Sequence, residues 1–257
     1  MINQSAQKKF YFFVFNLTTI ALLFLGTTAF TQDNNISMAT TDWEPYYSST
    51  LKKGGVINEL VSTAFNRRGY TTSIIWVPWI RALRSVESGR SDVVLGAYFT
   101  EERSRLYHIS EPFFNIDVGI IALKEVNITS YSSLNDLRPY RIGINRGWAY
   151  TPAFDLAEYL NKDDATNHII TIRKLFARRV DMVAMSINIF KYEISKLENH
   201  TMSEVVVLDP LLGRNPLHIM MSLKTPEYVK KIDAFNSGMA EIKADGTYGR
   251  ILSEHGF

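Results

Sequence analysis

Two extended apolar stretches, residues 117–124 (DVGIIALK) and residues 217–223 (LHIMMSL), set the organisation of this chain. Each follows a unit in which short β-rich runs alternate with helical patterns, which is typical of a parallel sheet with helices on its faces. In the simplest arrangement the chain crosses from a first lobe to a second near residue 120 and returns near residue 220. We therefore predict a two-lobed α/β protein with two crossing hinge strands and a ligand site in the cleft.

Hydrophobic periodicity gives the elements of the two units. In the first unit we expect strands at residues 36–40, 72–77 and 92–96 and helices at residues 55–68 and 79–88. In the second we expect strands at residues 140–145, 168–172, 180–185 and 205–208, helices at 152–160 and 187–197, and a helical turn at 174–179.

Two terminal helices, residues 226–244 and 248–255, have no sheet of their own and must pack on an existing unit. The predicted division is therefore a first lobe at residues 32–118, a second lobe with the hinge strands at its ends at 119–221, and a return to the first lobe at 222–257.

The first 31 residues have the pattern of a secretory signal peptide. Lys8 and Lys9 precede a mostly apolar run at residues 10–25, and small residues follow, so cleavage after Ala29 or near Thr31 fits. An uncleaved membrane anchor is the alternative, because a slightly longer run would span a bilayer. Removal of Lys8 and Lys9 turns the net charge of +2 into formal neutrality. We expect an exported, periplasmic protein.

The composition excludes several classes of function. With 46% hydrophobic and 21% charged residues in 257, the chain has the balance of a soluble globular protein. It has no cysteine, so a disulfide, a thiol nucleophile and a thiolate metal site are all impossible. The five histidines lack the close helical spacing of a zinc site, and the net charge is too small for a nucleic-acid partner. We predict no metal and no cofactor.

Several short motifs occur in a fixed order along the chain: TTDWEPYY, SGRSDVVLG, TEER, SEPFF, SSLNDL, RIGINRG, RRVDMV and KADGTYGRIL. In this order and spacing the chain resembles the extracellular solute-binding proteins of bacterial ABC importers, in the polar amino-acid group (family 3, of the type II periplasmic binding protein kind). The resemblance implies a monomeric venus-flytrap protein, not an enzyme, that closes on a small solute. Its implied partners are a carboxylate-bearing solute and the permease and ATPase of an importer.

The resemblance also implies the residues of a first-lobe site. Arg103 of TEER matches the arginine that grips a ligand carboxylate, Gly96 stands where a backbone donor is expected, and Tyr98 lies between them. A guanidinium can make two parallel charge-assisted hydrogen bonds to a carboxylate. The alternative is that Arg103 pairs with Glu101 or Glu102 on a solvated turn.

Aromatic residues are implied on the wall of the same site. Trp43 falls where relatives place a ring that stacks on the solute, and Tyr46 and Trp79 are candidates for the same wall. The alternative is that some of these are core residues, above all Tyr46.

In the second lobe, the resemblance implies that the turn after RIGIN offers backbone N–H groups to the carboxylate, which suits an anion because amides at a helix N-terminus are unpaired. Its residues are Gly147, Trp148, Ala149 and Tyr150.

Relatives that bind amino acids usually have an aspartate five residues after the position of Asp181, where this chain has Ser186. A hydroxyl cannot offset the desolvation of an ammonium group. Either another acid, Glu44 or Asp42, replaces the aspartate, or the solute is not a standard α-amino acid.

Two other functions remain open. Some periplasmic dehydratases, such as cyclohexadienyl dehydratase, resemble these binding proteins, and Glu44 or Asp42 would then be the acid with a tuned pKa. A ligand-sensing module that reports to a separate signalling protein is the third possibility.

Overall fold

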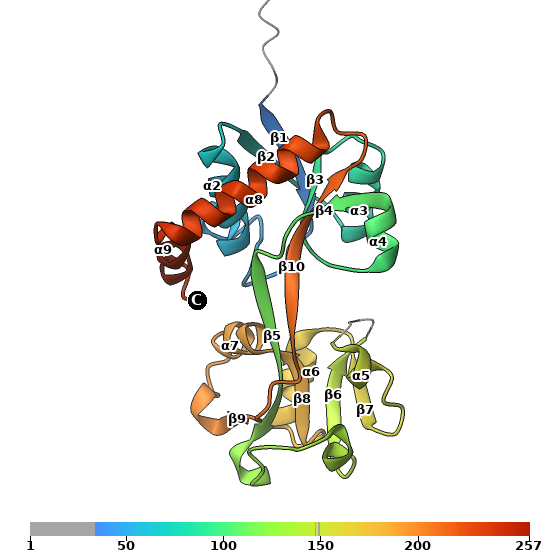
Figure 1. Ribbon diagram of the computed structural model, residues 1–257. Helices are drawn as coiled ribbons and strands as arrows, with labels where there is room; N and C mark the ends of the chain where they lie inside the picture. The colour runs from blue at the N-terminus through green and yellow to red at the C-terminus, as the bar shows by residue number, and fades with distance from the viewer. Residues whose placement is uncertain (1–33, 147, 149) are drawn as a thin grey trace, which may run out of the picture. The chain divides into compact units, whose positions relative to one another are not determined.

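One sheet runs through the part of the chain that the structure, a computed structural model, describes: residues 34–146, 148 and 150–257. Residues Asn35–Phe257 form one compact unit. The strands follow the path β2-β1-β3-β10-β5-β8-β6-β7, with β4 paired to β10 and β9 to β5 (Figure 1). The predicted signal peptide lies outside the described residues. No helix within the described ranges is long and apolar enough to cross a membrane.

The first lobe contains one end of this sheet. Its strands β1 (Asn35–Thr40), β2 (Thr71–Trp76) and β3 (Val93–Tyr98) are parallel, and the short β4 (Tyr107–Ile109) pairs antiparallel with β10. The lobe also holds the helices α2 (Val56–Arg67), α3 (Trp79–Glu87), α4 (Glu101–Leu106), α8 (Tyr228–Ala244) and α9 (Thr247–Glu254).

The second lobe contains the other end. Its strands are β6 (Arg141–Asn145), β7 (Asn161–Ala165), β8 (Met182–Ser186) and β9 (Val205–Val207), and β6 is parallel to both β7 and β8. Its helices are α5 (Pro152–Asp155), α6 (His168–Phe176) and α7 (Ile187–Ile194). Short 3-10 turns lie at Lys52–Gly54, Lys124–Val126, Leu134–Leu137 and Met202–Glu204.

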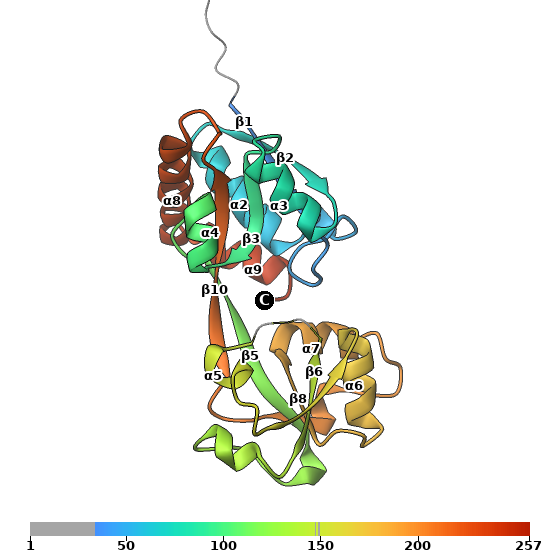
Figure 2. The same cartoon turned by 90° about the vertical axis from the view of Figure 1, so that its right-hand side faces the viewer.

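Two long strands join the lobes, as the sequence predicts. Residues 114–118 of β5 (Phe114–Leu123) pair antiparallel with residues 213–217 of β10 (Gly213–Ser222). Beyond this shared stretch, β5 continues beside β8 and β9 of the second lobe, while β10 continues beside β3 and β4 of the first. Figures 1 and 2 show the two strands side by side from both directions. The predicted pair of crossing strands is confirmed.

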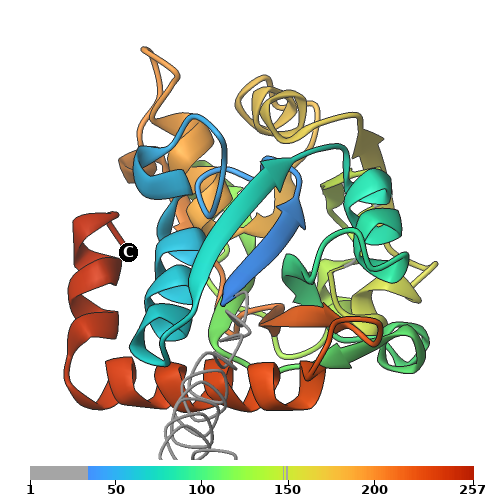
Figure 3. The same ribbon diagram turned by 90° about the horizontal axis from the view of Figure 1, so that it is seen from above.

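The C-terminal helices return to the first lobe. Helix α8 packs along α2, and α9 contacts both of them (Figure 3). Gly238 makes this close packing possible, because a Cβ atom there would lie only 2.0 Å from the backbone oxygen of Ala64.

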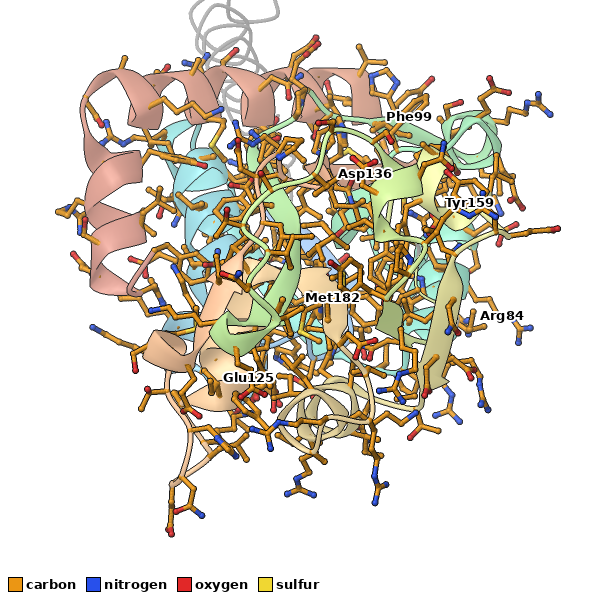
Figure 4. The ribbon with its side chains drawn as sticks, turned by 90° about the horizontal axis from the view of Figure 1, so that it is seen from below. Arg84, Phe99, Glu125, Asp136, Tyr159 and Met182 are labelled. Atoms are coloured by element: carbon orange, nitrogen blue, oxygen red, sulfur yellow. The ribbon has the colours of Figure 1, made fainter. Side chains whose placement is uncertain are left out.

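Apolar side chains fill both faces of the sheet. Met182 of β8, labelled near the centre of Figure 4, is completely buried, whereas Arg84, at the edge of that view, and Glu125 are exposed. The strands are therefore fixed from both sides, and the residues that follow them are held at defined positions.

Two local predictions for the second lobe are wrong, and one strand was not predicted. Residues 168–172 (HIITI) form the start of α6 and not a strand, because Asn167 caps the helix and Thr171, Ile172 and Leu175 bury one face of it. The helix expected at 152–160 ends at Asp155. The polar stretch NKDDA forms β7, a strand at the edge of the sheet where charged side chains reach water.

A further helix was not expected. TEER belongs to α4 and not to a turn. Thr100 caps this helix, its Oγ accepting the backbone N–H of Arg103 at 3.1 Å.

Candidate ligand-binding site

The predicted site residues follow the carboxyl ends of parallel strands. In the first lobe Trp43 follows β1 and Arg103 follows β3, and in the second Trp148 follows β6 and Ser186 ends β8. The carboxyl ends of parallel strands meet at one edge of a sheet, which is where open α/β sheets bind ligands. The topology therefore gathers residues that are up to 143 positions apart (Trp43 and Ser186).

A cavity of about 430 Å³ lies at this edge. Its described lining has eleven residues: Thr41, Asp42, Trp43, Tyr47, Trp79, Gly96, Ala97, Tyr98, Arg103, Trp148 and Leu217. Six of the predicted site residues are among them, namely Trp43, Trp79, Gly96, Tyr98, Arg103 and Trp148. Its volume is in the range of small-molecule sites.

Arg103 presents a partly buried guanidinium to the cavity. One of its terminal nitrogens donates to the backbone oxygen of Tyr98 at 2.7 Å, and its Cζ lies 5.6 Å from the centre of the Trp79 ring. Within the described residues, no carboxylate comes within 4.0 Å of it, so the expected alternative of an ion pair with Glu101 or Glu102 is not observed.

Burial also shapes the electrostatics of this arginine. It lowers the pKa of Arg103, and the nearby Tyr107 and Glu102 oppose the shift. The guanidinium remains charged at neutral pH, since an arginine in a protein is not deprotonated there. It is thus a partly desolvated cation with unused donors, an arrangement suited to an anion.

Aromatic rings form most of the remaining wall. The Trp43 ring centre lies 5.9 Å from that of Trp148, 6.1 Å from that of Tyr98 and 5.6 Å from that of Tyr47. The His168 ring packs against Trp148 in a T-shaped arrangement, with the ring centres 4.5 Å apart. The indole N–H of Trp43 is buried and has no acceptor among the described residues, so this wall keeps an unused donor.

The second lobe contributes mainly through a smaller space of about 10 Å³ beside the cavity. It shares Trp43, Tyr98 and Trp148 with the main cavity, and Tyr150, His168 and Ser186 also line it. Burial lowers the pKa of His168 to about 4, so this imidazole is neutral at pH 7. The predicted contributions of Gly147 and Ala149 fall on positions outside the described residues.

Tyr46 lies behind the wall and not on it. Its side chain is fully buried and is absent from the described lining of both spaces. Its hydroxyl lies 2.6 Å from Ser186 Oγ, and burial raises its pKa to about 12. Tyr46 therefore matches the alternative of a core residue, and its neutral hydroxyl connects the two lobes.

The two candidate acids differ in their surroundings. Asp42 lines the cavity but is exposed, and its Oδ1 accepts hydrogen bonds from the backbone N–H (2.7 Å) and the hydroxyl (3.0 Å) of Ser49. Glu44 accepts a 2.7 Å bond from the Tyr192 hydroxyl and lies 3.5 Å from Lys196 Nζ, both on or next to α7. The bond from Tyr192 is the main cause that lowers the pKa of Glu44.

Several lining residues were not expected from the sequence. Tyr47 could have been found from the paired tyrosines of TTDWEPYY; its hydroxyl donates to the Gly96 backbone oxygen at 3.0 Å. His168 falls in the stretch where the sequence pattern predicts a strand, so it gives no sign of a ligand contact. Leu217 lies in a hinge strand, where no local signal marks such a contact. In the described part of the chain, no group of three or more acidic or histidine side chains is arranged to hold a metal ion.

The crossing strands and the cavity at their side define an α/β binding protein of two lobes. The chain belongs to the bacterial extracellular solute-binding proteins, family 3, whose family model matches residues 36–256.

Solved structures have the same fold. One is an amino acid ABC transporter substrate-binding protein, AbpA, from Streptococcus pneumoniae bound to L-arginine, with 20% identity over 86% of this chain and 94% of that one and a TM-score of 0.63. A second is substrate-binding domain 2 of GlnP from Lactococcus lactis in an open conformation, with 18% identity over 87% of this chain and 96% of that one and a TM-score of 0.66.

A third similar structure comes from a different kind of protein. It is a histidine kinase sensor domain with similarity to periplasmic binding proteins, with 19% identity over 86% of this chain and 95% of that one and a TM-score of 0.63. At these identities the likeness concerns the fold.

Proposed function

We propose that this protein captures a small carboxylate-bearing solute, an amino acid or a similar compound, and delivers it to an ABC importer. The observation that carries the proposal is Arg103, a partly buried cation on the wall of a cavity of about 430 Å³ with no counter-ion among the described residues. A carboxylate would supply the missing charge and accept two of its N–H groups.

The proposed ligand residues comprise three groups. Arg103, Gly96, Tyr98, Trp43 and Trp79 form the first-lobe wall, with Tyr46 supporting it from behind. From the second lobe we propose the turn residues Gly147, Trp148, Ala149 and Tyr150 and the hydroxyl of Ser186. The ring of Trp148 on the cavity supports this arrangement.

The surroundings of the acids favour binding without catalysis. A dehydratase would need a pocket acid with a raised pKa, yet hydrogen bonds lower the pKa of both Glu44 and Asp42. Glu44 is also bonded to Tyr192 and is not part of the described cavity lining.

We propose a periplasmic location after signal-peptide cleavage, a monomeric state and the importer permease as partner. The family's extracellular character supports the location. We also propose lobe boundaries at residues 118/119 and 221/222. They fall within or at the end of the joining strands β5 and β10. The sensor domain with this fold makes a signalling partner the alternative to the permease.

A thermal-shift screen of the purified protein tests the central proposal. We expect hits among small carboxylates, and a ligand at one hundred times its dissociation constant stabilises by about 2.7 kcal/mol. Arg103→Ala should abolish the shift, and Arg103→Lys should retain only part of it because the two-pronged donor is lost.

Arg105→Ala is the matched control, since this exposed arginine lies on the same helix and outside the described cavity lining. Hits that consist only of sugars or cations, or a full shift in Arg103→Ala, would refute the proposed role of the arginine.

A further inference from the structure

The described cavity lining is unusually aromatic and has few charges. Five of its eleven residues have aromatic rings, and the charged ones are Arg103 and Asp42. The smaller neighbouring space adds His168, which is neutral at pH 7 because burial lowers its pKa to about 4. The described wall therefore offers one partly desolvated positive charge and a large area for ring contacts.

Asp42 is poorly placed to hold a second, positive group of a ligand. It is exposed, and Ser49 already donates two hydrogen bonds to Oδ1. Glu44 is bonded to Tyr192, Thr50 and Lys196. In the second lobe, Ser186 Oγ already forms hydrogen bonds with the Tyr46 hydroxyl and with the backbone N–H of Ile189 at the start of α7. Among the described residues, a buried ammonium or guanidinium would thus lack a carboxylate partner that offsets its desolvation.

The aromatic rings, in contrast, line the same cavity as Arg103 and are open to a ligand. The Arg103 guanidinium lies over the Trp79 ring and donates a hydrogen bond to the backbone oxygen of Tyr98. The Trp43 ring packs against those of Tyr98 and Trp148. Trp148 is 41% exposed although its ring packs against Trp43 and His168, so the ring has free area to offer. A flat apolar group attached to the carboxylate would cover this area and gain ring–ring contacts.

We propose that the solute is a carboxylic acid bearing an aromatic ring, and that recognition does not require an α-ammonium group. This inference rests on the proposed function, because Arg103 holds the carboxylate in both. It narrows the solute from any small carboxylate to one whose ring packs on Trp43 and Trp148.

Isothermal titration of the purified protein with matched probes tests the substrate class. The probes are phenylpyruvate, indole-3-acetate, L-phenylalanine, L-arginine, L-glutamate and phenethylamine. We expect the two ring acids to bind about tenfold or more tightly than L-arginine and L-glutamate, since several ring contacts are gained. Phenethylamine, which has the ring without the carboxylate, should not bind.

Two variants connect the result to the residues. Trp148→Ala should weaken the ring acids about tenfold, and Trp148→Phe should restore most of the affinity. Because Trp148 is substantially exposed, its removal should leave the melting temperature of the free protein nearly unchanged. Asp42→Asn should change the affinities of phenylpyruvate and L-phenylalanine equally.

The possible failures are distinguishable. Tighter binding of L-arginine or L-glutamate than of the ring acids, lost in Arg103→Ala, would overturn the aromatic class and leave the proposed function intact. Preference for L-phenylalanine over phenylpyruvate that disappears in Asp42→Asn would overturn the statement on the ammonium group. If no carboxylate binds, both the proposed function and this inference fail.

Discussion

The hydroxyl oxygens of Tyr46 and Ser186 lie 2.6 Å apart, although 140 residues separate them in the sequence. Tyr46 follows β1 of the first lobe, while Ser186 ends β8 of the second and caps α7 by accepting the backbone N–H of Ile189. Both side chains are buried. This bond fixes the aromatic loop at residues 43–47 to the start of a helix in the other lobe, directly behind the proposed site.

Tyr46→Phe should destabilise the protein. The change leaves the buried Ser186 hydroxyl without its strongest partner, which costs about 1–3 kcal/mol. Urea denaturation followed by circular dichroism measures the loss. In the double variant with Ser186→Ala, both polar groups are gone, so the cost should be smaller than the sum of the two single changes. Strict additivity would show that the two hydroxyls do not interact.

Gly96→Ala should lower stability, because Gly96 has φ +71 and a Cβ atom there would lie 2.7 Å from the Tyr47 ring. The left-handed backbone alone costs a non-glycine residue about 1–2 kcal/mol. Differential scanning calorimetry should show a lower melting temperature. Gly249→Ala is the control: it lies in α9 with open space around it and should gain about 0.5–1 kcal/mol. Equal effects of the two changes would contradict this account.

Tyr192→Phe should weaken ligand binding although Tyr192 lies outside the described lining of both spaces. Its hydroxyl joins α7 of the second lobe to Glu44 of the first, and Lys196 Nζ lies over its ring at 3.9 Å from the centre. Loss of this hydrogen bond, worth about 1 kcal/mol, should reduce the fraction of molecules whose lobes are in contact. Because only this fraction binds the ligand well, the apparent affinity should fall about fivefold.

Titration calorimetry gives the affinity of Tyr192→Phe, and small-angle scattering should show a larger radius of gyration in the free variant. Tyr159→Phe serves as the comparison, because Tyr159 is an exposed tyrosine of the second lobe. Unchanged affinity and radius would show that the bond does not hold the lobes together.

Acid should destabilise the protein through His168. Burial lowers its pKa from 6.5 to about 4, so the folded state prefers the neutral ring. The unfolded chain therefore binds the proton more readily, and the contribution of His168 to stability is complete above pH 6.5 and is lost as the pH falls toward 4. The free energy of unfolding of the wild type should decline more steeply over this interval than that of His168→Gln. Equal pH dependence of the free energy of unfolding in the wild type and His168→Gln would argue against a buried neutral imidazole.

Much of this fold follows from local sequence patterns. The alternation of β-rich and helical runs and the two apolar stretches predict the crossing strands β5 and β10, and periodicity places α2, α3, α8 and α9 within a few residues. The errors fall where tertiary packing outweighs local preference. The β-branched HIITI becomes the start of α6 because one face of it is buried, and the charged NKDDA becomes β7 because an edge strand tolerates charge.

The sequence by itself determined the class of the protein and named Arg103, Trp43 and Trp148 as site residues, because motifs at the ends of strands are local features. Only the tertiary structure decided which of them share a cavity, that Tyr46 is buried behind its wall, and that Glu44 is bonded across the lobes to Tyr192. The physical reason is that burial, counter-ions and ring contacts depend on which distant segments the sheet brings together, and no local pattern in the chain encodes those distances.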